Sequence, residues 1–195
     1  MQRFVILSGC SGGGKSSLLD QLARRGYRVV EEPGRRIVRE ETEQGGSALP
    51  WADVAAFLRR AITISLRDRD AAPSQDWVFF DRGLIDAASA LQHVTGEPVL
   101  EELGRKHRYY PQVFLTPPWP EIYSTDAERR HSFDDAIAEY ERLLKTYPSL
   151  GYKVILLPKI GIRERADFVL ETLQQGVAAE NPRSPDKRQS SPDAS

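Results

Sequence analysis

The residues best suited to chemistry stand near the start of the chain, in the segment Gly9-Cys10-Ser11-Gly12-Gly13-Gly14-Lys15-Ser16-Ser17. Its spacing fits the pattern G-x-x-x-x-G-K-[ST], in which a glycine-rich backbone turns its N–H groups toward phosphate oxygens. In this pattern Lys15 neutralises phosphate charge and the Ser16 hydroxyl holds Mg²⁺. We therefore predict that residues 9–17 bind ATP through its phosphates.

The flanking residues supply the context that this pattern needs. The apolar run Phe4-Val5-Ile6-Leu7 predicts a buried strand, and residues 17–23 predict the first turns of a helix. A strand, a glycine-rich turn and a helix N-terminus together form an anion-binding arrangement.

Two carboxylates that end predicted strands are the next candidates. Asp81 follows Trp77-Val78-Phe79-Phe80 and can hold Mg²⁺ directly or through water, while Arg82 beside it can contact phosphate or orient Asp81. Glu32 follows the predicted strand 27–31 and is the candidate general base for an acceptor hydroxyl. Glu31 is the alternative base, because neighbouring residues of a strand point to opposite faces.

Five apolar runs, near residues 4–7, 27–31, 77–80, 112–115 and 153–157, predict strands that alternate with helical sequence. This alternation predicts an α/β fold with a parallel sheet, in which ligands bind beyond the carboxyl ends of the strands. The phosphate loop, Glu32, Asp81 and Arg82 should therefore meet in one crevice. We expect one domain over residues 1–175 and a disordered tail over 176–195, where bulky apolar residues are scarce.

A proline-rich stretch, residues 116–120, interrupts regular structure because proline lacks an N–H donor. The charged segment after it carries Arg129 and Arg130. Since arginines on a mobile lid can close over phosphates, we predict a lid over residues 117–135; the alternative is a solvated helix face. Arg163 and Arg165, after the last predicted strand, are candidates for cradling the nucleotide base.

Composition limits the partners. The formal net charge of −1 offers no general basic field, so nucleic acid is an unexpected partner. The single cysteine, Cys10, excludes an intrachain disulfide and fits a reducing compartment. The first residues do not resemble a signal peptide, and no apolar run approaches the ~20 residues of a membrane span. We expect a cytoplasmic protein with no membrane partner; oligomeric state stays open.

Four stretches together resemble the small P-loop ATPase/kinase family that bears the name AAA domain. They are the phosphate loop, Glu-Glu-Pro-Gly-Arg-Arg at 31–36, Asp-Arg-Gly-Leu-Ile-Asp at 81–86, and Pro-Pro-Trp-Pro-Glu-Ile-Tyr-Ser-Thr-Asp-Ala-Glu-Arg-Arg at 117–130. That family is similar to the kinase domain that phosphorylates nicotinamide riboside and, more distantly, to deoxynucleoside and thymidylate kinases. The resemblance covers nearly all of residues 2–174.

The resemblance implies a P-loop NTPase fold of nucleoside-kinase type, with five parallel strands in the order 2-3-1-4-5 and helices on both faces. It also implies that Glu32 activates the acceptor hydroxyl, that Arg36 lies near the acceptor, and that Asp81 and Arg82 serve Mg²⁺ and phosphate. Arg129 and Arg130 resemble lid arginines. The sequence has no obvious arginine finger or sensor pattern of ring-forming AAA proteins, so a hexameric motor is not expected.

We therefore expect an ATP- and Mg²⁺-dependent phosphotransferase that acts on a small hydroxyl-bearing acceptor, with a nucleoside-like molecule as one candidate. The acceptor should lie between Glu32, Arg36, the Asp81–Arg82 pair and the helix that contains Phe57. One rival is a nucleotide-dependent switch that acts through a protein partner, and a weaker one is a nucleic-acid end kinase. The acid pair Glu32 and Asp81 favours transfer to a hydroxyl.

Overall fold

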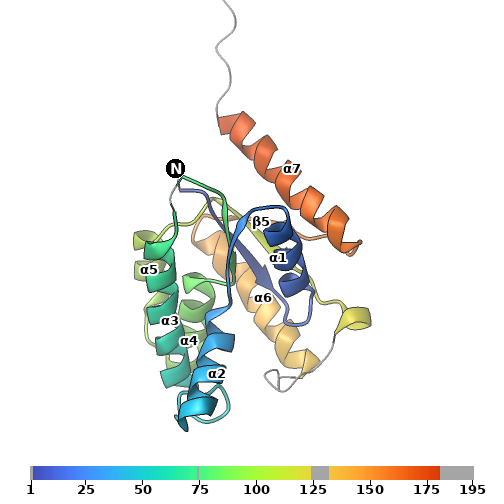
Figure 1. The fold of residues 1–195 in the computed structure, drawn as a ribbon. Coiled ribbons are helices and arrows are strands. Elements are labelled where there is room, and N and C mark those ends of the chain that lie inside the picture. The colour runs from blue at the N-terminus through green and yellow to red at the C-terminus, as the bar shows by residue number, and fades with distance from the viewer. Residues whose placement is uncertain (1, 74, 124–131, 181–195) are drawn as a thin grey trace, which may run out of the picture.

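The structure is a computed structural model, and it describes residues 2–73, 75–123 and 132–180. A five-stranded sheet with the order β2-β3-β1-β4-β5 forms its centre, and every neighbouring pair of strands is parallel (Figure 1). The strands are β1 (Phe4–Gly9), β2 (Arg28–Val30), β3 (Val78–Asp81), β4 (Gln112–Thr116) and β5 (Lys153–Leu156). The predicted strands and their order are confirmed.

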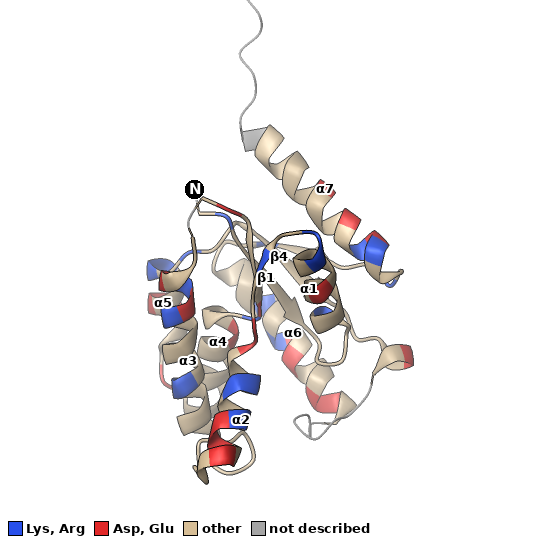
Figure 2. Ribbon diagram, in the orientation of Figure 1, with Lys and Arg blue, Asp and Glu red and all other residues tan. Residues whose placement is uncertain are grey.

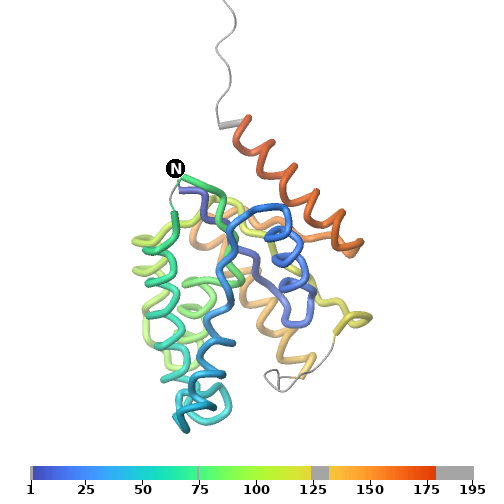
Figure 3. Tube along the Cα trace, in the orientation of Figure 1, coloured from blue at the N-terminus to red at the C-terminus, as the bar shows by residue number. Residues whose placement is uncertain are grey.

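Helices cover both faces of the sheet. They are α1 (Lys15–Arg24), α2 (Pro33–Gln44), α3 (Val54–Ala71), α4 (Leu84–Thr95), α5 (Leu100–Lys106), α6 (Phe133–Ser149) and α7 (Ile162–Glu180), with a 3₁₀ turn over Pro120–Ile122. Figure 3 follows the chain through these layers, in which α3 packs against α4 as well as against α2.

Strand alternation divides the core into two clusters. Phe4 and Ile6 of β1 pack against α4 and α6 on one face, while Val5 and Leu7 pack against α1 and α7 on the other. Because β1 is central and all four of these side chains are buried, the strand is fixed on both faces. The phosphate loop that leaves its carboxyl end is therefore held by a rigid base.

A third apolar cluster joins α2, α3 and α4 through Ile37, Ala61, Ile64 and Ala87. It positions the three helices that wall the smaller of the two cavities described below. Figure 2 shows acidic and basic residues interspersed along α2 and α6. Among the described residues, no helix is both long enough and apolar enough to cross a membrane.

Two boundaries differ from the sequence-based expectation. The sequence pattern predicts a helix from Trp51 onward, but α3 begins at Val54, because the Asp53 carboxylate caps it by accepting a hydrogen bond from the Ala56 N–H at 2.9 Å. The domain expected to end at residue 175 continues in α7 to Glu180, because alanine and glutamate favour helix and carry it past a single glycine. The rest of the predicted tail, residues 181–195, lies outside the described residues.

Candidate functional site

The phosphate loop connects β1 to α1 and depends on glycine at two turns. Gly9 has φ = 103°, and a Cβ there would lie 2.5 Å from the Thr116 carbonyl oxygen of β4. Gly14 has φ = 78° and precedes the first residue of α1. The Cys10 N–H donates to the Thr116 carbonyl at 2.9 Å, so the loop is seated on the carboxyl end of the neighbouring strand.

Lys15 folds back over this loop. Its buried ammonium donates to the Cys10 carbonyl oxygen at 3.0 Å. Burial lowers the pKa of Lys15 and the Arg82 charge lowers it further, while Asp81 works in the opposite direction. The Cys10 side chain lies in the core, where burial raises the pKa of its thiol, so it has the environment of a packing residue rather than a nucleophile.

A cavity of about 500 Å³, which we call the loop cavity, lies over the phosphate loop. Its lining comprises Ser11, Gly12, Gly14, Lys15, Ser16 and Ser17 of the predicted segment, Trp119, Ile122, Ile160, Ile162 and Arg165 from the segments that follow β4 and β5, and Glu32, Arg35 and Arg82. Gly9, Cys10 and Gly13 lie behind this surface and shape the loop without lining the cavity.

Arg165 contributes a buried guanidinium to this cavity. The residue is 2% exposed, its Nη1 donates to the Gly13 carbonyl at 3.2 Å, and its guanidinium carbon lies 5.7 Å from the centre of the Trp119 ring. Its Nε and Nη2 atoms have no hydrogen-bond partner among the described residues. Such unsatisfied donors suit an anionic oxygen or an acceptor atom of a base. Arg163 is exposed and lines neither cavity.

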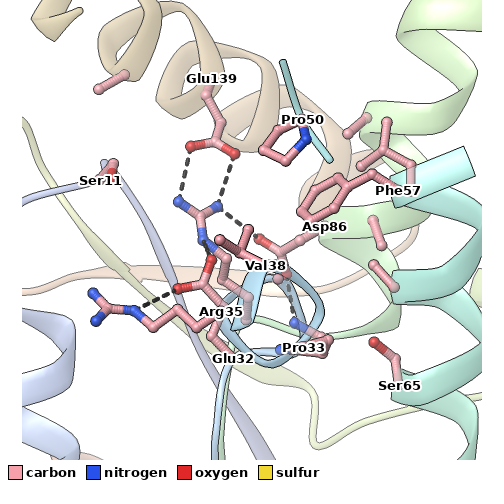
Figure 4. Close-up of a pocket in the computed structure, with 18 of the residues that line it drawn as sticks. Ser11, Glu32, Pro33, Arg35, Val38, Pro50, Phe57, Ser65, Asp86 and Glu139 are labelled. Atoms are coloured by element: carbon pink, nitrogen blue, oxygen red, sulfur yellow. Dashed lines mark hydrogen bonds and ion pairs between the residues drawn. The ribbon is translucent and has the colours of Figure 1, made fainter. Parts of the chain in front are cut away.

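A second cavity of about 300 Å³, the helix cavity, lies between α2, α3, α4 and α6 (Figure 4). Apolar residues of the first three helices form one side, including Val38, Phe57, Leu58 and Ala87. Charged residues form the other side, toward the sheet. Phe57, predicted from the sequence to contact an acceptor, is in this wall.

Arg82 is the centre of the charged side. Its Nη1 and Nη2 donate to the two carboxylate oxygens of Glu139 at 2.9 and 2.8 Å, and its Nε lies 3.2 Å from Glu32 Oε1 (Figure 4). Burial opposes its charge, but Glu139, Glu32 and Asp86 raise the pKa of Arg82 well above its ordinary value. Burial likewise opposes ionisation of Glu139, yet Arg82 outweighs it and the pKa of Glu139 is lowered.

The backbone of Arg82 is unusual. Its φ of 60° is the one positive value found for a described residue other than glycine, and its N–H extends the sheet by donating to the Leu7 carbonyl at 2.9 Å. A strained backbone of this kind is characteristic of functional sites, where the surrounding contacts maintain it.

Four residues line both cavities, namely Ser11, Glu32, Arg35 and Arg82. The two cavities therefore meet at a junction formed by the phosphate loop, the N-terminus of α2 and the residue after β3. Arg35 Nε lies 3.5 Å from Glu32 Oε2, so the Glu32 carboxylate stands between two arginines at this junction.

Asp81 lies at the end of β3 and lines neither cavity. It is 6% exposed, and burial together with the nearby Glu32 charge raises its pKa to about 6. Its Oδ1 has no hydrogen-bond partner in the described ranges, which fits a buried oxygen that awaits a cation or its water. Ser16 presents an exposed position to the loop cavity. The described residues contain no cluster of three metal-ligating side chains, so Mg²⁺ would also need phosphate oxygens and waters.

Other predicted residues lie elsewhere. Glu31 is exposed and pairs with Arg39 at 3.0 Å, so of the two adjacent glutamates only Glu32 faces the cavities. Arg36, expected near an acceptor, instead pairs with Asp68 of α3 at 2.6 Å and lines neither cavity. Its neighbour Arg35 takes the expected place, because successive helical residues point about 100° apart.

The predicted lid is described only at its ends. Arg129 and Arg130 lie outside the described residues, as does the whole of 124–131. The flanking residues Tyr123 and Phe133 meet with ring centres 4.8 Å apart, and a Cβ on Gly12 would lie 2.5 Å from the Tyr123 ring. The start of the lid segment is thus packed directly on the phosphate loop.

Sequence reasoning missed Glu139, Arg142, Asp86 and Ser65, all of which line the helix cavity. Asp86 accepts from the Ser8 hydroxyl, from the Tyr147 hydroxyl at 2.6 Å and from the Gly83 N–H at 3.0 Å. The available signal for α6 was the spacing of Asp135, Glu139 and Arg142, which places three charges on one helix face.

Comparison with known proteins agrees with this architecture. The family model described as "AAA domain" matches residues 4–165. No curated protein matches the chain in sequence. The chain is similar in structure to shikimate kinase from Acinetobacter baumannii in complex with shikimate, with a TM-score of 0.57 and 15% identity over 90% of this chain and 95% of that one.

Two nucleotide-related structures are similar to the same degree. Deoxyadenosine kinase from M. mycoides with bound dATP has a TM-score of 0.57 and 14% identity, over 88% of this chain and 99% of that chain. Thymidylate kinase from Ehrlichia chaffeensis has a TM-score of 0.54 and 18% identity, over 89% and 98%. At these identities the likeness establishes the fold.

Proposed function

Because the chain belongs to the AAA domain family of P-loop proteins, we propose that it is an ATP- and Mg²⁺-dependent phosphotransferase whose acceptor is a small molecule with a hydroxyl group. The observation that carries this proposal is the junction of the two cavities. A nucleotide on the phosphate loop would direct its terminal phosphate toward Ser11, Glu32, Arg35 and Arg82, which also line the helix cavity. The nucleotide and the acceptor molecule can then meet at the junction, so the phosphoryl group does not have to pass through solvent.

Each residue at the junction has a distinct part. The loop N–H groups and Lys15 bind the phosphates, and Arg82 supplies a permanent positive charge beside the transferred group. Glu32 accepts the proton of the acceptor hydroxyl as that oxygen bonds to the γ-phosphorus and the bond from the γ-phosphorus to the β–γ bridging oxygen breaks, with ADP as the leaving group. Its contacts with Arg82 and Arg35 hold the carboxylate in one orientation.

Ser16 and Asp81 would hold Mg²⁺, which would supply positive charge to neutralise the phosphates. The buried, unpartnered Asp81 Oδ1 supports this assignment in the described part of the chain. Arg129 and Arg130 belong to the proposal as lid arginines that exclude water, on the family resemblance alone.

The solved relatives support the two halves of the reaction separately. The deoxyadenosine kinase structure holds dATP and the shikimate kinase structure holds shikimate, an alcohol. Both ligand types fit a fold that places a nucleotide next to a small acceptor. The 300 Å³ helix cavity is at the small end of ligand pockets and suits a metabolite rather than a macromolecule.

The test is acceptor-stimulated ADP formation over a library of small alcohols, with the product identified by mass spectrometry. We expect a product heavier by one phosphoryl group, which the Lys15→Ala variant fails to form. Slow ADP formation that no alcohol accelerates, but that a protein partner does, would instead identify a nucleotide-dependent switch. Stimulation by oligonucleotide ends alone would identify a nucleic-acid kinase.

A further inference from the structure

The charges that line the helix cavity restrict what it can bind. Among the described residues, three arginines face four carboxylates: Arg35, Arg82 and Arg142 against Glu32, Asp86, Asp135 and Glu139. The wall therefore has a formal excess of one negative charge. An acidic ligand would meet net repulsion there.

Each of these arginines already has a carboxylate neighbour. Arg82 is held by both oxygens of Glu139 and by Glu32, Arg35 lies 3.5 Å from Glu32, and Arg142 lies 4.0 Å from Glu139. All three nitrogens of Arg82 face carboxylate oxygens, so this guanidinium would have to give up one of these contacts to bind a carboxylate or phosphate group in the cavity. Such an exchange leaves a carboxylate without its partner in a partly buried site, which is costly.

The apolar side of the cavity contains one polar group that stands out. Ser65 of α3 lines the cavity, is 3% exposed, and its Oγ has no hydrogen-bond partner within the described ranges. Figure 4 shows it on the α3 side, opposite the charged group around Glu139. A buried hydroxyl left without a partner costs free energy, so it calls for an explanation.

Three threonine hydroxyls in other helical positions are satisfied locally. Thr63 donates to the Arg59 carbonyl at 3.1 Å, Thr95 to Leu91 at 2.8 Å and Thr172 to Phe168 at 2.7 Å, each to the residue four positions earlier. Ser65 lies in the same helix as Thr63 yet makes no such bond. Its hydroxyl is thus available to a molecule in the cavity.

We propose, given the proposed function, that the ligand of the helix cavity is a neutral or positively charged alcohol with an apolar body. The body lies against Phe57 and its neighbours, a polar atom at the far end exchanges a hydrogen bond with Ser65 Oγ, and the reacting hydroxyl lies at the Glu32 end. Acids such as shikimate are disfavoured, although the fold is shared with a shikimate kinase.

The test measures binding separately from turnover. Calorimetric titration compares matched alcohols that differ in one carboxylate, such as shikimate against methyl shikimate and orotidine against uridine, followed by a library of such pairs. We expect neutral members to bind at least about tenfold more tightly than their acids, a difference of about 1.4 kcal/mol. Tighter or equal binding of the acids, or no neutral binder in the library, would overturn the proposal.

Ser65→Ala locates the ligand. We expect the best neutral ligand to bind this variant about three- to tenfold more weakly, while the free protein melts at an equal or higher temperature because an unsatisfied hydroxyl has gone. Thr63→Val removes a hydroxyl from the exposed side of the same helix and should leave ligand affinity unchanged. Unchanged affinity in Ser65→Ala would contradict the assigned contact. Neutral ligands that bind but never receive phosphate would refute the proposed function and leave the ligand chemistry standing.

Discussion

The contact between Arg82 and Glu139 offers a sharp test of how the site is held together. Glu139 accepts two hydrogen bonds from the Arg82 guanidinium, at 2.9 and 2.8 Å, and the Arg82 side chain is only 12% exposed. Glu139→Gln keeps the shape of the side chain and removes its charge. Its amide has one oxygen left to accept a hydrogen bond, so Arg82 loses both a bond and most of its charge compensation.

The expected loss of stability follows from these contacts. Removing one partner of a buried ion pair costs about 3–5 kcal/mol. Arg82 keeps Glu32 at 3.2 Å and Asp86 at 3.8 Å, and glutamine keeps one hydrogen bond. We therefore expect a smaller loss in the free energy of unfolding, about 2 kcal/mol. For a chain of this size that is about 4–8 °C in melting temperature.

Urea unfolding followed by circular dichroism measures this loss. Glu141→Gln is the matched control, since Glu141 lies on the same helix with an exposed side chain, and its change should stay within about 0.5 kcal/mol. Equal effects of the two substitutions, or no effect of either, would refute the reasoning.

The stability that Glu139 contributes should change with pH in a defined direction. Arg82 outweighs burial and lowers the pKa of Glu139 in the folded protein. The stabilisation from ionised Glu139 is therefore fully present above the ordinary glutamate pKa and is lost as the pH falls through the lowered one. The stability difference between wild type and Glu139→Gln should narrow in acid; a difference that widens would contradict the assignment.

Three further substitutions test the junction and its support. Glu32→Gln should leave nucleotide affinity within about twofold and slow transfer by about 10²-fold or more, as single-turnover kinetics would show; full activity would remove Glu32 as the base. Arg165→Met should weaken nucleotide binding by about tenfold or more in calorimetry, because its buried donors are lost, and unchanged affinity would refute that role. Gly9→Ala should destabilise the fold more than Gly26→Ala, since both have positive φ but only Gly9 would also clash with Thr116, and equal melting temperatures would refute this.

The strands and the phosphate loop could be predicted because their signals are local. Every residue of an apolar run such as Phe4 to Leu7 favours burial, so the run predicts a strand that is covered on both faces. The spacing of the glycines, lysine and serine in the phosphate loop likewise indicates one loop geometry. The order of the strands came from the family resemblance. Helix ends were less predictable. The capping side chain of Asp53 and the helix-forming residues after Gly176 set two of these ends, and the apolar periodicity of the sequence does not show them.

The acceptor side of the site could be predicted only in part. Glu32 and Phe57, both predicted from the sequence, line the helix cavity, but Arg35 lines it in place of the predicted Arg36 because the phase of α2 is set by Pro33 at the start of the helix. Ser65 carries no sequence signal of its own, and the charge spacing around Glu139 marks a helix face without saying what that face meets. Their roles arise because α3 and α6, far apart in sequence, face one cavity.

A crystal structure with Mg²⁺ and a non-hydrolysable ATP analogue would test the central claim most directly. The quantity to measure is the position of the terminal phosphorus relative to the junction of the two cavities. We predict that it lies beside Arg82, with the Glu32 carboxylate facing it from the helix cavity. A terminal phosphate directed away from Ser11, Glu32, Arg35 and Arg82 would contradict the account.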